Sequence, residues 1–155
     1  MNRELWNSGG EGSPQRTQAR NQKRKLNYYS NIYVVKDSAN PENEGKVFLY
    51  RYGKKIFDKI MESMQPAFED ETPVNPFDFW KGADFKLKIT KVAGFWNYDK
   101  SEFDAPSTLG DLKDKELEAL WKQEYSLSAF TADDQFKSYD AVSYTHLRAH
   151  ETDSY

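Results

Sequence analysis

The chain has 155 residues, of which 37% are hydrophobic and 15% aromatic, so it is long enough for one domain, or a piece of one, with a modest core. It contains no apolar run of membrane-spanning length. It also contains no cysteine, which excludes a disulfide, a thiolate nucleophile and a cysteine-based zinc site.

The net charge of −3 conceals an uneven distribution of charge along the chain. Residues 1–60 hold 12 Lys and Arg against 6 Asp and Glu, a net of +6, whereas residues 61–155 hold 10 against 19, a net of −9. Such asymmetry favours a local surface that binds a polyanion. The alternative is a cationic face that is merely solvated.

The first part of the chain is polar and then becomes aromatic. Residues 1–22 contain several glycines and Pro14, so we expect a loop that serves as a linker or as the remnant of an upstream subdomain. Residues 27–36 are rich in aromatic and β-branched side chains and predict a strand, and residues 46–52 predict a second one. The intervening segment contains Asn40-Pro41 and Gly45, which favours a hairpin with a long loop.

The apolar spacing becomes helical over residues 54–64, which predicts a short amphipathic helix. Residues 65–79 contain three prolines and are expected to be irregular. Apolar and lysine side chains alternate over residues 83–92, which predicts a half-buried strand, followed by a turn with three rings at residues 94–98. Residues 111–130 predict a helix whose apolar stripe includes Leu117, Leu120, Trp121 and Leu127.

The segment from Val142 onward has a different character from the rest of the chain. Back-translated, residues 142–152 resemble a transposase-type sequencing adapter, so we predict that residues 142–155 are a non-native tail. Both histidines of the chain, His146 and His150, lie in this segment. Their helical metal-ligand spacing therefore carries no weight as a sign of a metal site.

The remaining residue types offer little for catalysis. Without His or Cys, a nucleophile would need serine with a lysine or carboxylate base, and no nucleophile elbow, Ser-x-x-Lys pattern or phosphate-binding glycine loop is present. Acidic runs such as Glu69-Asp70-Glu71 are more typical of solvated loops than of cation sites. We therefore predict that the chain is not an enzyme.

Cations and aromatic rings are interleaved between Lys23 and Lys59 more densely than a core requires. Cations neutralise phosphates, and an aromatic face can stack on any base, so this pattern favours a surface for single-stranded nucleic acid. Adjacent residues of a strand point to opposite faces, so one of Tyr28 and Tyr29 is expected in the core, and either choice is open. The cations that flank the rings of this run are Lys23, Arg24, Lys25, Arg51, Lys54 and Lys55.

Several longer segments carry a resemblance to a known family. The segments are residues 31–37, 40–48, 50–56, 79–88, 94–103 and 134–139. With them, residues 2–141 resemble the single-stranded DNA-binding proteins of T-even bacteriophages, the helix-destabilising replication proteins. The resemblance implies a mainly β fold with α elements, in which residues 23–141 form a partial OB-fold barrel core with accessory helices.

The resemblance also implies which residues line the DNA cleft. Tyr28, Tyr29, Tyr50, Phe95 and Tyr98 fall on aromatic positions of the cleft, and Trp6 falls on a further one. Arg24 and Arg51 fall on basic positions, with Lys23 and Lys25 beside the first. The implied activity is sequence-nonspecific binding of single-stranded DNA in phage replication, recombination and repair, in the cytoplasm of the infected bacterial host.

The chain departs from this family in several ways. The family's basic arm and its Cys/His zinc module have no counterpart before Met1, and adapter-like sequence stands where the acidic tail is expected. We therefore expect an internal fragment without zinc or another cofactor and without cooperative self-association. The expected partner is single-stranded DNA, with no membrane. The alternative function is a protein-interaction module whose acidic helix, residues 111–130, recruits replication and recombination proteins.

Overall fold

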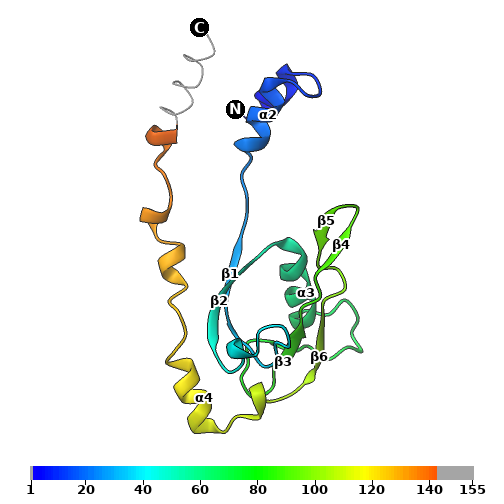
Figure 1. Cartoon of the computed structure of the whole chain (residues 1–155), viewed down its shortest axis with the longest axis vertical. Coiled ribbons are helices and arrows are strands. Elements are labelled where there is room, and N and C mark those ends of the chain that lie inside the picture. Colours follow the sequence, from blue (N-terminus) through cyan, green and yellow to red (C-terminus); the bar gives the residue numbers. More distant parts are fainter. Residues whose placement is uncertain (1, 143–155) are drawn as a thin grey trace. The chain divides into compact units, whose positions relative to one another are not determined.

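The computed structural model describes residues 2–142, which form a mixed α/β structure (Figure 1). The helices are α1 (Asn2–Ser8), α2 (Pro14–Asn21), α3 (Lys54–Met64) and α4 (Asp114–Trp121). The strands are β1 (Tyr28–Tyr33), β2 (Val47–Tyr52), β3 (Ala83–Lys86), β4 (Thr90–Val92), β5 (Phe95–Asn97) and β6 (Glu102–Pro106). They pair as three two-stranded sheets, β1–β2, β3–β6 and β4–β5.

The expectation of a mainly β fold is corrected, because helices and short sheets contribute on a similar scale. The sheets formed by the described residues do not close into a barrel. The chain divides into two compact units. Unit 1 comprises Met1–Tyr28, Arg51–Asn75 and Phe85–Asp104, and unit 2 comprises Tyr29–Tyr50, Pro76–Asp84 and Ala105–Tyr155.

The prediction of an irregular amino-terminal segment is wrong, because α1 and α2 occupy most of it. The Ser13 side chain caps α2 by accepting a hydrogen bond from the Arg16 N–H at 3.3 Å, and Pro14 occupies the first turn. Ala19 is buried with 3% of its surface exposed. The glycines that suggested a loop separate the two helices, so they mark a turn rather than a linker. The assignment of residues 1–22 to an upstream subdomain stays a prediction.

The two strands and the helix that follow are confirmed. β1 and β2 form the predicted hairpin, which continues beyond β1 through hydrogen bonds of Val34 with Lys46 and Gly45. Gly53 then separates β2 from α3, whose bounds match the predicted helix. Ile56 is the most deeply buried residue of α3, with 4% exposed. The proline-containing residues 65–79 form no regular helix or strand.

The single strand predicted over residues 83–92 is wrong, because it is divided into β3 and β4. The Ser101 hydroxyl accepts a hydrogen bond from the Lys88 N–H at 2.9 Å and donates one to the Lys88 carbonyl at 3.2 Å. Ser101 is only 2% exposed. At Lys88 the Ser101 side chain thus supplies the backbone hydrogen bonds that a neighbouring strand would otherwise make. The alternation of apolar and lysine residues in the sequence cannot reveal this contact.

Replacing Ser101 with alanine is expected to lower the free energy of unfolding by about 1–3 kcal/mol, because the Lys88 N–H and carbonyl would lose their shared partner in a buried place. The measurement is urea unfolding followed by circular dichroism. Ser107, which is exposed, provides the matched control for a Ser→Ala change. A midpoint for the Ser101 variant equal to that of the Ser107 variant would contradict this prediction.

The turn predicted over residues 94–98 is shorter than expected. Ala93 and Gly94 alone connect β4 to β5, and both have positive φ values, 51° and 82°. Positive φ at both central residues is the requirement of the tight turn that matches the twist of a two-stranded hairpin. The rings of Phe95 and Trp96 therefore belong to a strand, not to the turn. β6 is not predicted from the sequence, and its Phe103 packs on Phe85 with ring centroids 4.8 Å apart.

The helix predicted over residues 111–130 is shorter in the structure, where α4 ends at Trp121. Leu117 and Leu120 are buried as predicted, whereas Trp121 is 63% exposed. The side chain of Asn31 binds both the N–H and the carbonyl of Tyr125, at 2.8 and 3.0 Å. Backbone groups that a longer helix would use are satisfied by this side chain instead.

Two further expectations concern the ends of the chain and membranes. Apart from Val142, the predicted non-native tail lies outside the described residues. None of the helices in residues 2–142 combines the length and the apolar character needed to cross a bilayer.

Candidate nucleic-acid interface

Most of the predicted binding residues belong to unit 1. Only Tyr29 and Tyr50 fall in unit 2. Unit 1 therefore carries a candidate surface with three parts, namely the basic segment before β1, a stack of rings at the start of α3, and the β4–β5 hairpin. The residues of unit 1 on the predicted list are Lys23, Arg24, Lys25, Tyr28, Arg51, Lys54, Lys55, Phe95 and Tyr98.

The basic segment Lys23–Lys25 follows the end of α2 and is exposed throughout. Within residues 2–142, none of its three side chains has a carboxylate partner. Three adjacent cations without local neutralisation raise the electrostatic potential around them. Arg51 of β2 is exposed as well. These cations are therefore available to phosphates.

The ring of Tyr28 lies in an aromatic stack within unit 1. It is parallel to the Phe57 ring of α3, with centroids 4.1 Å apart and an interplanar angle of 10°, and it also stacks on Tyr52 at 5.8 Å. Tyr52 is buried with 8% exposed, and Tyr28 is half-buried. The stack thus joins Tyr28, three residues after the basic segment, to the first turn of α3.

Tyr29 also has an aromatic partner, because its ring stacks on Phe130 at 5.0 Å in unit 2. Both Tyr28 and Tyr29 are half-buried. The sequence leaves open which of the two belongs to the core, and in the structure each of them has an intramolecular ring contact. A base that stacks on either ring must therefore use what surface the protein contact leaves.

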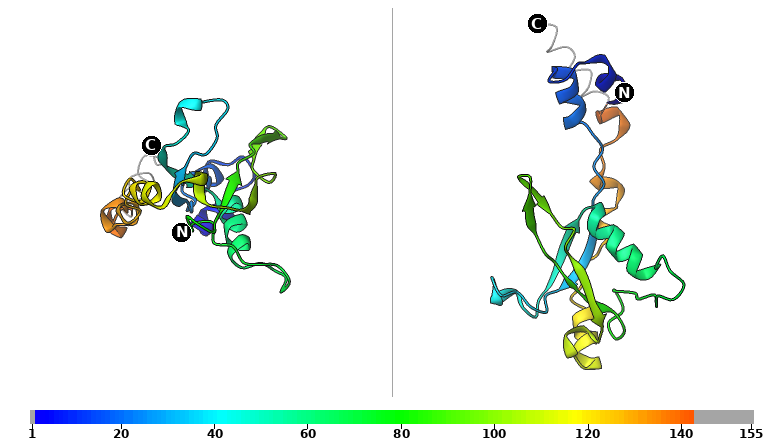
Figure 2. Two further views of the ribbon diagram at one scale, coloured as in Figure 1. Left: turned by 90° about the horizontal axis from the view of Figure 1, so that it is seen from below. Right: turned by 90° about the vertical axis from the view of Figure 1, so that its right-hand side faces the viewer.

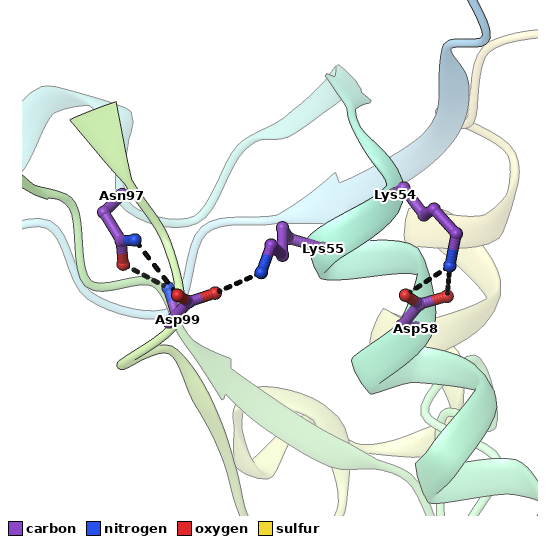
Figure 3. A network of polar contacts seen from close by, with 5 residues as sticks. All are labelled: Lys54, Lys55, Asp58, Asn97 and Asp99. Atoms are coloured by element: carbon purple, nitrogen blue, oxygen red, sulfur yellow. Dashed lines mark hydrogen bonds and ion pairs between the residues drawn. The ribbon is translucent and has the colours of Figure 1, made fainter. Parts of the chain in front are cut away.

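Lys54 and Lys55 are exposed but have carboxylate partners (Figure 3). The Lys54 ammonium contacts both Asp58 oxygens at 2.6 and 2.9 Å, and this hydrogen bond raises the pKa of Lys54. Lys55 contacts Asp99 at 3.2 Å. Exposed ion pairs contribute little free energy, so a phosphate can replace either carboxylate at small cost. These two lysines are nevertheless weaker phosphate ligands than the unpaired basic segment.

Asp99 connects α3 to the strand β5 of the hairpin. The Asn97 side chain donates to the Asp99 carboxylate at 3.0 Å, and the Asn97 oxygen accepts from the Asp99 N–H at 2.9 Å. The hydrogen bond from Asn97 and then that from Lys55 lower the pKa of Asp99. Asp99 therefore stays ionised, and able to pair with Lys55, to a lower pH than an aspartate without these partners.

The β4–β5 hairpin presents the most exposed rings of the candidate surface. Phe95 is 78% exposed and Trp96 is 64% exposed, whereas Tyr98 beyond the strand is half-buried. The Lys91 ammonium lies 4.8 Å from the centroid of the Trp96 ring. Neither Trp96 nor Lys91 is among the binding residues predicted from the sequence, although the run of three rings at residues 94–98 is a signal that could have found Trp96.

Trp6 of α1 is 40% exposed and has partners in α2, and its place in the DNA cleft stays a prediction. The guanidinium groups of Arg16 and Arg20 lie 4.7 and 5.5 Å from its ring centroid, and Arg16 Nε donates to the Trp6 carbonyl at 3.2 Å. These contacts join α1 to α2. Cation–π contacts of this kind stabilise a helical pair, so Trp6 has a structural role within unit 1.

The residues that the structure describes do not fit a zinc site. Among the described residues, no group of three or more His, Cys, Asp or Glu side chains lies close enough to hold a metal ion. The sequence contains no cysteine, and His146 and His150 lie outside the described residues.

Comparison with known proteins gives a consistent set of relatives. Residues 1–149 match the family model described as "gp32 DNA binding protein like". The chain is 48% identical over 123 residues to the single-stranded DNA-binding protein of Enterobacteria phage T2, and 48% identical over 122 residues to that of Enterobacteria phage T4. These alignments cover 78% and 77% of this chain.

The same alignments cover 41% and 40% of the two relatives, so the chain spans about two fifths of their length. The family match ends at residue 149, which lies beyond Ala141, the last residue before the predicted non-native tail. The exact start of that tail stays a prediction.

Proposed function

Because the chain belongs to the family of gp32-like DNA-binding proteins, we propose that it binds single-stranded DNA without base specificity, as part of phage DNA replication. The observation that carries the proposal is the composition of unit 1. An unpaired basic segment, Lys23–Lys25, lies three residues before Tyr28 of the ring stack, and a hairpin with highly exposed rings belongs to the same unit.

The proposed mechanism needs no covalent chemistry. Lys23, Arg24, Lys25 and Arg51 neutralise phosphates, and the release of counterions from the DNA supplies much of the affinity. Phe95 offers its open ring to a base, and every base has a face that can stack. Because neither interaction depends on the edge of a base, the surface distinguishes unpaired from paired strands rather than one sequence from another.

The proposal extends to the remaining predicted residues. Tyr28, Tyr29, Tyr50 and Tyr98 would contact bases with the surface that their half-buried rings leave exposed. Lys54 and Lys55 would exchange their carboxylate partners for phosphates. We also propose that the short sheets belong to an OB-fold core, that the protein acts without catalysis in the host cytoplasm, and that it serves recombination and repair as well as replication.

A salt titration of oligonucleotide binding tests this function. The expected result is that the full chain binds fluorescein-labelled oligo(dT) and mixed-sequence oligomers with similar affinity, and that log K falls linearly with log salt by about 0.7 for each phosphate neutralised. Duplex DNA of the same length is expected to bind more weakly. An affinity that is indifferent to salt, or equal for duplex and single strand, would contradict the proposal.

A further inference from the structure

The β4–β5 hairpin has two different exposed faces. Its register places Lys91 opposite Trp96 and Val92 opposite Phe95. Directly opposed residues share a face, and successive residues of a strand alternate between faces. Trp96 with Lys91 is therefore on one face, and Phe95 with Val92 is on the other. The hairpin is a narrow two-stranded ribbon, seen in green in Figure 2.

Both faces of this ribbon expose apolar surface. Phe95 is 78%, Trp96 64% and Val92 54% exposed. Because these side chains are exposed on both sides of one short hairpin, packing of a hydrophobic core does not explain them. Ala93 at its turn has a φ of 51°, a conformation that alanine rarely adopts and that costs on the order of a few RT. The tight turn between β4 and β5 is thus formed although the backbone conformation of Ala93 is energetically unfavourable.

The face with Trp96 also carries the right charge for a nucleotide. The Lys91 ammonium lies over one side of the indole ring, 4.8 Å from the centroid, and the indole is still 64% exposed. A base can stack on the open side of the ring while the ammonium contacts the adjacent phosphate. Among the described residues, the Lys91 ammonium has no carboxylate partner and no hydrogen-bond partner, so it is available to a phosphate.

We propose that Trp96 and Lys91 form a second nucleotide-binding position, on the face of the hairpin opposite Phe95, which takes one unpaired base and its phosphate. The inference rests on the single-stranded DNA binding proposed above. With a base on Phe95 and another on Trp96, the hairpin lies between two nucleotides of one strand. It acts as a wedge that a continuous base stack in a duplex cannot accept.

The test compares Trp96→Ala with Trp121→Ala in the full chain. Trp121 is matched in residue type and exposure, at 63%, but belongs to α4 in unit 2. Trp96→Ala is expected to weaken oligo(dT) binding about tenfold, whereas Trp96→Phe, which retains a ring, stays within about threefold of the unsubstituted chain. Trp121→Ala is expected to bind as the unsubstituted chain does. Equal thermal midpoints verify that the variants are folded.

The lysine is tested by its effect on salt dependence. Lys91→Gln is expected to reduce the slope of log K against log salt by about 0.7, the contribution of one phosphate on a single strand. Lys115→Gln, an exposed lysine of α4, is expected to leave the slope unchanged. If Lys91 only supports the Trp96 ring, affinity falls but the slope does not, and the assignment of a phosphate to Lys91 is overturned.

Fluorescence separates this inference from the function on which it rests. Base stacking quenches indole emission, so Trp96→Phe is expected to lose part of the quenching that oligo(dT) causes, while Trp121→Phe keeps it. Binding with full affinity and full quenching by the Trp96 variants overturns the second position and leaves the proposed function standing. Failure of the unsubstituted chain to bind oligo(dT) at any salt overturns the proposed function, and the inference with it.

Discussion

Replacing Lys23, Arg24 and Lys25 together with glutamine is expected to weaken the binding of single-stranded DNA on the order of a hundredfold at about 50 mM salt. The reason is that these side chains are exposed and lack carboxylate partners in the described part of the chain, so each can neutralise one phosphate. The slope of log K against log salt is expected to decrease in magnitude by about 2. Fluorescence anisotropy at several salt concentrations measures both quantities.

A matched control removes the same number of charges elsewhere. Lys115, Lys122 and Lys137 are exposed and belong to unit 2, and their combined replacement with glutamine changes the net charge equally. This control is expected to change the salt slope by much less than the variant of the basic segment. Equal losses in the two variants would show that net charge, rather than a local contact with phosphates, determines affinity.

Replacing Tyr28 with alanine is expected to lower the free energy of unfolding by about 2–3 kcal/mol, because the ring lies 4.1 Å from Phe57 and also stacks on the buried Tyr52. DNA affinity is expected to fall at the same time, since Tyr28, three residues after the basic segment, packs on α3 and is a proposed base contact. Urea unfolding and oligonucleotide binding at a temperature well below the thermal midpoint measure the two effects separately.

Two further variants serve as controls for the effects of Tyr28→Ala on stability and on DNA affinity. Tyr28→Phe retains the ring and is expected to preserve both stability and affinity. Tyr139→Ala removes the same side chain from a site that is 81% exposed and is expected to change neither by much. If Tyr28→Ala lost affinity with no change in unfolding, the ring would act as an open base platform rather than as part of a packed stack.

The sequence was most predictive where a local pattern coincides with a local structure. The helical spacing of Ile56, Ile60 and Met64 led to the correct bounds for α3, and aromatic, β-branched segments led to β1 and β2. It was least predictive where distant side chains intervene. Ser101 divides a predicted strand at Lys88, and Asn31 binds the backbone at Tyr125, beyond the early end of α4. Neither contact leaves a periodic signal.

The same distinction applies to the candidate site. The density of cations and rings between Lys23 and Lys59 follows from composition alone, and it is what indicates a surface for a single-stranded polyanion. Which cations are already paired depends on contacts with other segments, as Lys55 with Asp99 shows. Which rings are open likewise depends on packing, because Phe57 and Phe130 cover parts of Tyr28 and Tyr29.

The amino-acid sequence therefore reveals the residue types that could neutralise phosphates and stack on bases, and the family to which the chain belongs. Which of those groups are available follows from the folded structure. Availability is a matter of burial and pairing, and both are set by residues far apart in the chain. For this reason Trp96 and Lys91, opposed across a two-residue turn, became candidates only once β4 and β5 were seen to pair.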